Sequence, residues 1–306
     1  MNWLIVAPDK ASKDLSTVKD FLNGKKDSIK ELFICENLSK AQIEEVLKEM
    51  EDVSHCIILD TIKIQNNTNY TFLLGLLCGL KIGTFLQVNP GVFSKYEILK
   101  YQFGMFFKIY ENVNDILSSI EKNYTSYEKA FLQKQALKDL MKKGIPFSAD
   151  SFATFIEKDN DEMCQKFLEA GMDVNAFTVS GIPLLGVACR SDCINKVKWL
   201  LDNGADINVV SKDRGYTPVM DAVWRKDYDI VELLIQRKAK LNCVSSDGQP
   251  ILVLAVGNGN AKIVELLLAS GADADIKDSM GMSARGYANL FKKDGMVELF
   301  AKYPEK

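Results

Sequence analysis

The chain has 306 residues, of which 47% are hydrophobic and 26% are charged, and its formal net charge is −3. This length suggests two domains of ordinary size, and the hydrophobic content excludes a wholly disordered chain. A nearly neutral charge excludes a protein built mainly for non-specific nucleic-acid binding, so we expect no nucleic-acid partner.

The residues that usually carry chemistry are few. The seven cysteines form no Cys-x-x-Cys pair, which is typical of buried free thiols in a reducing compartment. Cys189 and Cys193 lie four residues apart, so a zinc site stays open as the alternative to buried thiols. The single histidine, His55, precedes an apolar run and is interpreted as structural rather than as a general base. We therefore expect no metal and no cofactor.

The first residues, 1–7, are apolar but too short for a signal peptide, because Pro8, Asp9 and Lys10 follow at once. They predict a first strand. The longest later apolar run, residues 72–80, is about half the length that a membrane span needs. We therefore expect no membrane association and a cytoplasmic location.

Residues 1–122 alternate strands with helices. We predict strands at 2–7, 31–35, 55–60, 83–88 and 105–110, and helices at 39–50, 69–80 and 114–122. Short continuous apolar runs, such as 56–60, are typical of strands covered on both faces. Five strands with crossover helices predict a doubly wound parallel sheet of the flavodoxin or Rossmann type.

A doubly wound sheet binds ligands outside the carboxyl ends of its strands. Polar residues follow several of the predicted strands and make a candidate binding crevice: Asp9, Lys10, Asp60, Asn67, Asn69, Tyr70 and Asn89. No glycine-rich phosphate loop follows a strand, and no arginine precedes Arg190. A dinucleotide is therefore disfavoured, whereas Lys10 or a helix N-terminus can hold one phosphate of a nucleotide.

The same region resembles a known family. His55-Cys-Ile-Ile-Leu-Asp60, followed by Asn67-Thr-Asn-Tyr-Thr-Phe-Leu-Leu-Gly75, is similar to nucleoside 2-deoxyribosyltransferases and their TIR-like relatives. In that family the strand ends in Asp, and a glutamate in the next helix attacks the anomeric carbon. Aligning Leu74-Gly75 with the family's Leu-Gly places Leu73 at the glutamate, and leucine has no lone pair to offer. The resemblance thus implies the fold without the family chemistry, and if the protein is an enzyme Asp60 is the candidate catalytic residue.

Residues 123–147 connect the two halves. The run from Ala136 to Gly144 has the pattern of the second helix of a repeat without a first one. We expect it to cap the start of the C-terminal half.

The C-terminal half repeats from about Ser148 onward. Its turn glycines Gly181, Gly215, Gly248 and Gly281 are spaced 34, 33 and 33 residues apart. Gly204-Ala-Asp, Lys238-Ala-Lys and Gly271-Ala-Asp each follow a turn glycine by 23 residues, and a Val-x-x-apolar-apolar block precedes each of them. A helix–turn–helix unit with this period resembles the ankyrin repeat and implies an α-solenoid of four to five repeats over 148–306, with atypical first and last units.

The repeat positions also predict packing. Ala188, Ala222, Ala255 and Ala288 share one helix position, where a small side chain lets neighbouring helices approach. Lys238 occupies a turn position that prefers a residue tolerating positive φ, so we predict a weaker junction there.

Ankyrin arrays usually bind proteins through their turn tips and first helices, so the resemblance implies a protein partner. In register, the candidate contact residues are Asp213, Arg214, Tyr216, Trp224, Arg225, Asp247 and Gln249. Tyrosine, tryptophan and arginine are enriched at interface hot spots. The alternative, that Trp224 packs locally and the arginines are solvated, stays open.

Two functions follow from the sequence. The first is a non-enzymatic adaptor, whose repeats bind a protein and whose sheet domain is a scaffold or a sensor of a nucleoside or nucleotide. The second is an enzyme that cleaves the glycosyl bond of a nucleoside or of NAD, with the repeats as a targeting arm. Leu73 favours the first.

Overall fold

The structure is a computed structural model that describes residues 1–8, 10–33, 44, 46–48, 50, 52–59, 68–88, 107–291 and 295–303. The chain divides into two compact units, Met1–Phe131 and Leu132–Lys306. Among the described residues, no helix has both the length and the apolar character needed to cross a membrane.

The N-terminal unit contains a five-stranded sheet in the order β2-β1-β3-β4-β5, and every pairing is parallel. The strands are β1 (Asn2–Ala7), β2 (Ser28–Phe33), β3 (His55–Ile58), β4 (Gly83–Gln87) and β5 (Phe107–Tyr110). The predicted parallel sheet is confirmed, but the prediction of the second strand at 31–35 is wrong at its start. β2 is an edge strand, so it tolerates half-exposed polar residues and is not marked by a continuous apolar run.

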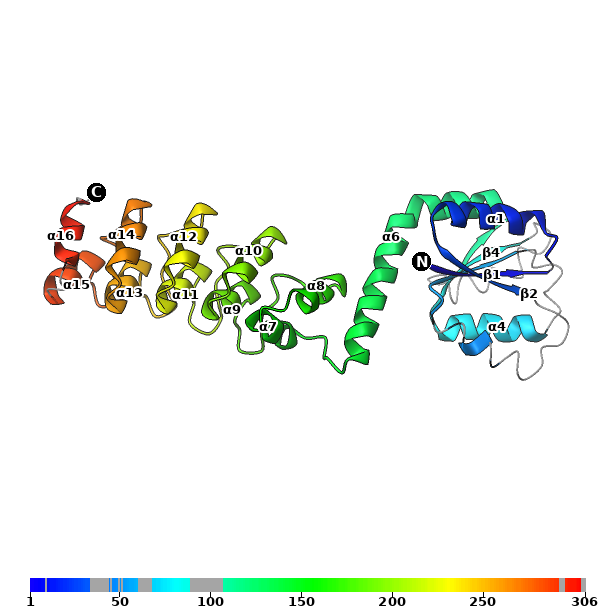
Figure 1. The fold of residues 1–306 in the computed structure, drawn as a ribbon, viewed down its shortest axis with the longest axis horizontal. Helices are drawn as coiled ribbons and strands as arrows, with labels where there is room; N and C mark the ends of the chain where they lie inside the picture. Colours follow the sequence, from blue (N-terminus) through cyan, green and yellow to red (C-terminus); the bar gives the residue numbers. More distant parts are fainter. Residues whose placement is uncertain are drawn as a thin grey trace. The chain divides into compact units, whose positions relative to one another are not determined.

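Helices cover both faces of this sheet, with α1 (Lys13–Gly24) and α4 (Thr68–Gly79) on opposite sides (Figure 1). Side chains of β1 alternate between the two faces. Trp3 and Ile5 pack in the core that includes Leu15, Val18 and Leu22 of α1. Leu4 and Val6 pack in the core that includes Leu73 and Leu77 of α4. Both faces are therefore buried, as the continuous apolar runs predicted.

The helix predicted at 114–122 does not end there. It is the start of α6, a single helix over Val113–Lys142 that also includes most of the predicted connector. The segment holds no glycine or proline, so nothing in it breaks the helix. The helix ends just before Gly144, whose φ of 68° is a left-handed value.

The C-terminal unit is a row of helix pairs joined by turns (Figure 1). The pairs are α7 (Ala149–Glu157) with α8 (Asp161–Glu169), α9 (Leu184–Arg190) with α10 (Ile194–Asp202), α11 (Pro218–Arg225) with α12 (Tyr228–Gln236), α13 (Ile251–Asn258) with α14 (Ala261–Ala269), and α15 (Ala284–Phe291) with α16 (Met296–Ala301). The predicted early repeat is present as the pair α7 and α8. It begins at Ser148 as predicted, since the Ser148 side chain accepts a hydrogen bond from the Ser151 backbone N–H and caps α7.

One apolar core runs through all of these pairs, and it uses the repeated positions. Ala188, Ala222, Ala255 and Ala288 are completely buried, as predicted for a position where first helices approach each other. The second helices contribute Val197, Leu200, Val231, Leu234, Val264 and Leu267, each worth about 1.5–3 kcal/mol of burial. Ala136 and Leu140 of α6 join the same core, so the predicted cap is the C-terminal part of α6.

The irregular junction at Lys238 has the predicted conformation. Lys238 has φ of 68°, where the corresponding Gly204 and Gly271 have 90° and 93°. A side chain with a Cβ is strained in this region, whereas glycine is not.

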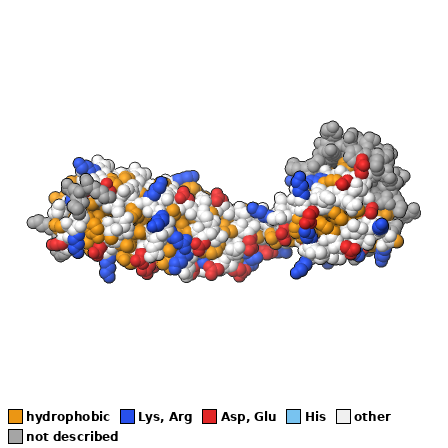
Figure 2. Space-filling view, turned by 90° about the horizontal axis from the view of Figure 1, so that it is seen from above, with side chains coloured by type: hydrophobic (Ala, Val, Ile, Leu, Met, Phe, Trp, Pro, Cys, Tyr) orange, Lys and Arg blue, Asp and Glu red, His pale blue; other side chains and the backbone are white. Residues whose placement is uncertain are grey.

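Charged side chains of both signs are interspersed with hydrophobic ones on the face of the molecule seen in Figure 2. This mixture agrees with the nearly neutral formal charge.

Candidate functional site

The repeats present a continuous surface at their turns. We call the turn tips around Gly181, Gly215, Gly248 and Gly281, with the exposed ends of the first helices, the turn-tip surface. Neighbouring turns are bonded to each other, because Lys212 N–H donates to the Gly181 carbonyl at 2.8 Å and Ser246 N–H donates to the Arg214 carbonyl at 3.2 Å. These bonds hold the turns around Gly181, Gly215 and Gly248 in fixed positions relative to one another.

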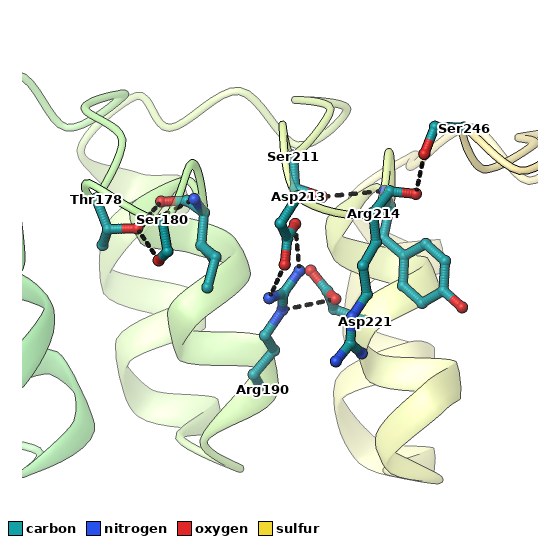
Figure 3. Close-up of polar contacts among 10 residues, drawn as sticks. Thr178, Ser180, Arg190, Ser211, Asp213, Arg214, Asp221 and Ser246 are labelled. Atoms are coloured by element: carbon teal, nitrogen blue, oxygen red, sulfur yellow. Dashed lines mark hydrogen bonds and ion pairs between the residues drawn. The ribbon is translucent and has the colours of Figure 1, made fainter.

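Within this surface, Arg190 at the end of α9 links two repeats. Its guanidinium makes two hydrogen bonds to the Asp213 carboxylate, at 2.7 and 3.1 Å, and its Nε donates to Asp221 Oδ1 at 2.8 Å (Figure 3). Asp213 comes from the following turn and Asp221 from α11, so one side chain joins three elements. Bidentate arginine–carboxylate pairs are among the strongest protein ion pairs.

The two aspartates titrate differently. The Arg190 guanidinium is the main cause that lowers the pKa of Asp213. Asp221 is 1% exposed at its side chain, and burial raises its pKa to about 6 despite the opposing charge of Arg190. The candidate contact residue Asp213 is therefore already paired within the chain.

The next repeat carries an exposed aromatic–arginine pair. The Arg214 guanidinium lies 4.7 Å from the ring centroid of Trp224, which is 40% exposed. Arg225 follows at the end of α11 and is exposed. Tyr216 is nearly buried, with its hydroxyl 3.5 Å from Gln249 Oε1. Arg214 and Trp224, both predicted, thus lie together, whereas Tyr216 supports the surface more than it forms it.

Farther along the same surface is a pocket of about 490 Å³. Asp247 and Gln249, both predicted contact residues, are among the residues that line it. The remaining lining includes Val253, Asp278, Met280, Tyr287 and Phe291, which the sequence analysis did not single out. The repeat register does relate two of them to predicted contact residues, since Met280 corresponds to Arg214 and Phe291 to Arg225.

The ligand crevice predicted in the N-terminal unit is described only in part. Asp9, Asp60, Asn67 and Asn89 lie outside the described residues, as do the side chains of Asn69 and Tyr70 in the first turn of α4.

Lys10, from the same predicted set, is exposed, with its ammonium 5.6 Å from the centroid of the Phe33 ring. At the carboxyl end of β4, Gln87 Nε2 donates to Asp14 Oδ2 at 2.7 Å. The sequence does not indicate this contact at the carboxyl edge of the sheet, because an acidic residue such as Asp14 is common in the first turn of a helix.

Two residues that bear on catalysis are packed among other side chains. They are Leu73, which aligns with the family's glutamate, and the single histidine, His55. Leu73 belongs to α4 and is buried in the core between this helix and the sheet. His55 stacks on Trp3 with ring centroids 4.9 Å apart and lies 4.8 Å from the Tyr127 ring, in keeping with a structural histidine.

The cysteines that the structure describes are free thiols. Burial raises the pKa of Cys164 to about 12 and also raises that of Cys189. In the described part of the chain, no cluster of three or more His, Cys, Asp or Glu residues is placed to hold a metal ion. Cys189 and Cys193 therefore have no described partners that would complete a zinc site.

The family described as ankyrin repeats (3 copies) matches residues 152–245 and 219–305, which together cover half of the chain. The chain belongs to the ankyrin-repeat family. The helix pairs of the C-terminal unit are thus ankyrin repeats, as the sequence predicted.

Similar proteins share the repeats to different extents. A putative ankyrin repeat-containing protein of Treponema pallidum is 26% identical over 250 residues, which are 82% of each chain. This alignment is longer than the unit Leu132–Lys306, so it extends into the N-terminal unit.

Other relatives match over a smaller part. A putative ankyrin repeat protein of Rickettsia bellii is 34% identical over 42% of this chain and 39% of its own length. The mouse B-cell lymphoma 3 protein homolog is 33% identical over 35% of this chain and 24% of its own length.

Proposed function

We propose that the protein is a non-enzymatic adaptor that binds a protein partner through the turn-tip surface of its ankyrin repeats. Repeat arrays of this kind expose an extended surface suited to binding. The observation that carries the proposal is the exposed Trp224, held beside Arg214 on a surface whose turns are bonded to each other. Tryptophan and arginine are the residue types that most often dominate binding energy.

The rigidity of the turns supports the same function. A surface that is already ordered loses little conformational entropy on binding, so more of the contact energy contributes to affinity. The Arg190 ion pairs and the bonds between turns order the part of the surface that flanks Arg214.

For the N-terminal unit we propose a nucleotide-fold scaffold that senses a small ligand. The strand order β2-β1-β3-β4-β5 is the order of flavodoxin-like folds, which supports this interpretation. The candidate ligand is a nucleoside or a nucleotide at the carboxyl ends of the strands. Leu73 is in the core, so glycosyl-bond cleavage by the family's glutamate has no counterpart at that position.

The adaptor proposal is tested by comparing the proteins that the full chain captures from cells expressing it. The variant carries Trp224→Ala and Arg214→Ala. Its matched control carries Tyr228→Ala and Arg237→Ala, an exposed tyrosine at the start of α12 and the exposed arginine that follows its end. We expect the first variant to lose partner recovery about 30-fold, as removal of a hot spot of 2 kcal/mol predicts, and the control to keep it. Circular dichroism checks that both variants fold. Equal recovery by the folded first variant and the wild type would overturn the proposal.

A further inference from the structure

The pocket between the last two turns is a second feature of the turn-tip surface, separate from the Trp224–Arg214 pair. Val253 and Val256 of α13 are buried along one side of it, and Tyr287 and Phe291 of α15 line another. Its volume of about 490 Å³ falls within the range of pockets that bind ligands.

Large apolar side chains are exposed at this pocket. Met280 at the turn tip is 77% exposed and Phe291 is 60% exposed. The Phe291 ring stacks parallel to Tyr287, with centroids 5.9 Å apart. Apolar groups gathered around one hollow indicate that it binds an apolar group.

The charges of the pocket are all of one sign among its described lining residues. Asp247 and Asp278 contribute carboxylates, and the described lining contains no lysine or arginine. Asp278 accepts hydrogen bonds from the Tyr287 hydroxyl at 2.7 Å and from the Met280 and Met282 backbone N–H groups at 2.9 Å each. These donors lower the pKa of Asp278, so the carboxylate is ionised and held in place at neutral pH.

We propose that this pocket binds a segment of a protein partner in which an apolar side chain is next to a lysine or an arginine. The apolar side chain fills the space against Val253, Met280 and Phe291, and the cation meets Asp278 or Asp247. A cation is also attracted to the faces of the Tyr287 and Phe291 rings. An acidic residue in its place would be repelled, so the pocket selects its partner by charge as well as by shape.

This inference rests on the proposed adaptor function and specifies the partner for one part of its surface. It is tested with the full chain on an array of immobilised twelve-residue peptides of random sequence. We expect the retained peptides to be enriched in apolar–basic neighbours and depleted of apolar–acidic neighbours, and their binding to weaken with salt.

Two variants remove the proposed determinants one at a time. Asp247→Asn with Asp278→Asn keeps side-chain acceptors for the turn but removes both charges, and we expect retained peptides to bind about tenfold more weakly and without preference for a basic residue. Met280→Ser with Phe291→Ser should lose the preference for an apolar residue. The control is Asp229→Asn, which removes an exposed charge in the first turn of α12.

The outcomes separate this inference from the adaptor proposal. Three results would overturn the pocket assignment. No peptide is retained, acidic peptides are enriched, or the preference for a basic residue survives Asp247→Asn with Asp278→Asn. Loss of partner recovery in the Trp224→Ala, Arg214→Ala variant would still support the adaptor function in that case.

Discussion

Replacing Arg190 with alanine should destabilise the junction between two repeats, and by an amount that depends on pH. In the native protein Arg190 is the cation that Asp213 and Asp221 share. Asp213 keeps access to water when the arginine is removed, but Asp221 is completely buried and its Oδ2 already has no hydrogen-bond donor among the described residues. The substitution therefore leaves a buried carboxylate without its counter-charge.

The pH dependence follows from the titration of Asp221 in the presence of Arg190. Its pKa is about 6 in the folded protein and 3.8 as an ordinary aspartate, which disfavours the ionised folded form by about 3 kcal/mol. Because the folded pKa is the higher one, this group stabilises the fold least at high pH, and stability falls as the pH rises from about 4 to about 6. Removal of Arg190 raises the pKa further, since a favourable charge is lost.

We therefore expect Arg190→Ala to cost about 3 kcal/mol near pH 8, where Asp221 is ionised in the wild type, because removing one partner of a buried ion pair typically costs that much. Near pH 5 Asp221 binds a proton instead, and the cost should fall to about 1 kcal/mol, the contribution of the partly exposed ion pair between Arg190 and Asp213. Hydrogen exchange at the backbone amides of α9 and α11 measures both values in the full chain, through the ratio of variant to wild-type exchange rates at each pH.

Asp221→Leu provides the matched control. Val187 and Leu254 fill the corresponding position in the neighbouring repeats, so a leucine there suits the packing. We expect this variant to change stability by less than about 1 kcal/mol, and Arg190→Ala added to it to cost much less than in the wild type. A cost of Arg190→Ala that is equal at both pH values, or equal with and without Asp221, would refute the electrostatic explanation.

The remaining predictions concern the turns. Lys238→Gly should stabilise the protein by about 0.5–1 kcal/mol, because it removes the strain of a left-handed lysine at some cost in unfolded-state entropy; a lower urea midpoint would contradict this. Gly215→Ala should cost about 3 kcal/mol or more, since a Cβ there would lie 2.4 Å from the Ser246 backbone nitrogen at a φ of 67°. Gly204→Ala should cost only about 1 kcal/mol in the same urea unfolding assay, because Gly204 has a φ of 90° but no atom lies within 4 Å of the added Cβ. Equal losses of stability at the two glycines would show that the close approach of the turns does not cause the loss at Gly215.

Much of the fold was predictable because its patterns are local. Each repeat carries its own turn glycine and its own buried alanine, so helix, turn and core position all follow from a short stretch of sequence. The strands of the sheet interior were equally clear, since both of their faces are apolar. The predicted bounds of β2 and α6 differ from the structure for separate reasons. An edge strand such as β2 needs little apolar character, so its start is not marked in the sequence. The helix α6 continues until a helix-breaking residue ends it, and the first one after its start is Gly144.

The candidate site was less predictable, because register gives a residue's position but not its role. Arg190 and Trp224 occupy the same position in successive repeats, yet Arg190 forms internal ion pairs while Trp224 is exposed. The difference comes from Asp221, which corresponds to Val187 and Leu254 in the other repeats and gives Arg190 a buried partner.

The chemistry of one repeat's surface is thus decided by the repeat that follows it in the sequence. Arg190 and Asp221 are 31 residues apart, and neither repeat alone shows that they pair. The same holds for the pocket, where Asp247 of one turn and Asp278 of the next become a single acidic site only when the repeats stack. A partner should therefore recognise pairs of adjacent repeats, and a substitution in one repeat should alter binding at its neighbour.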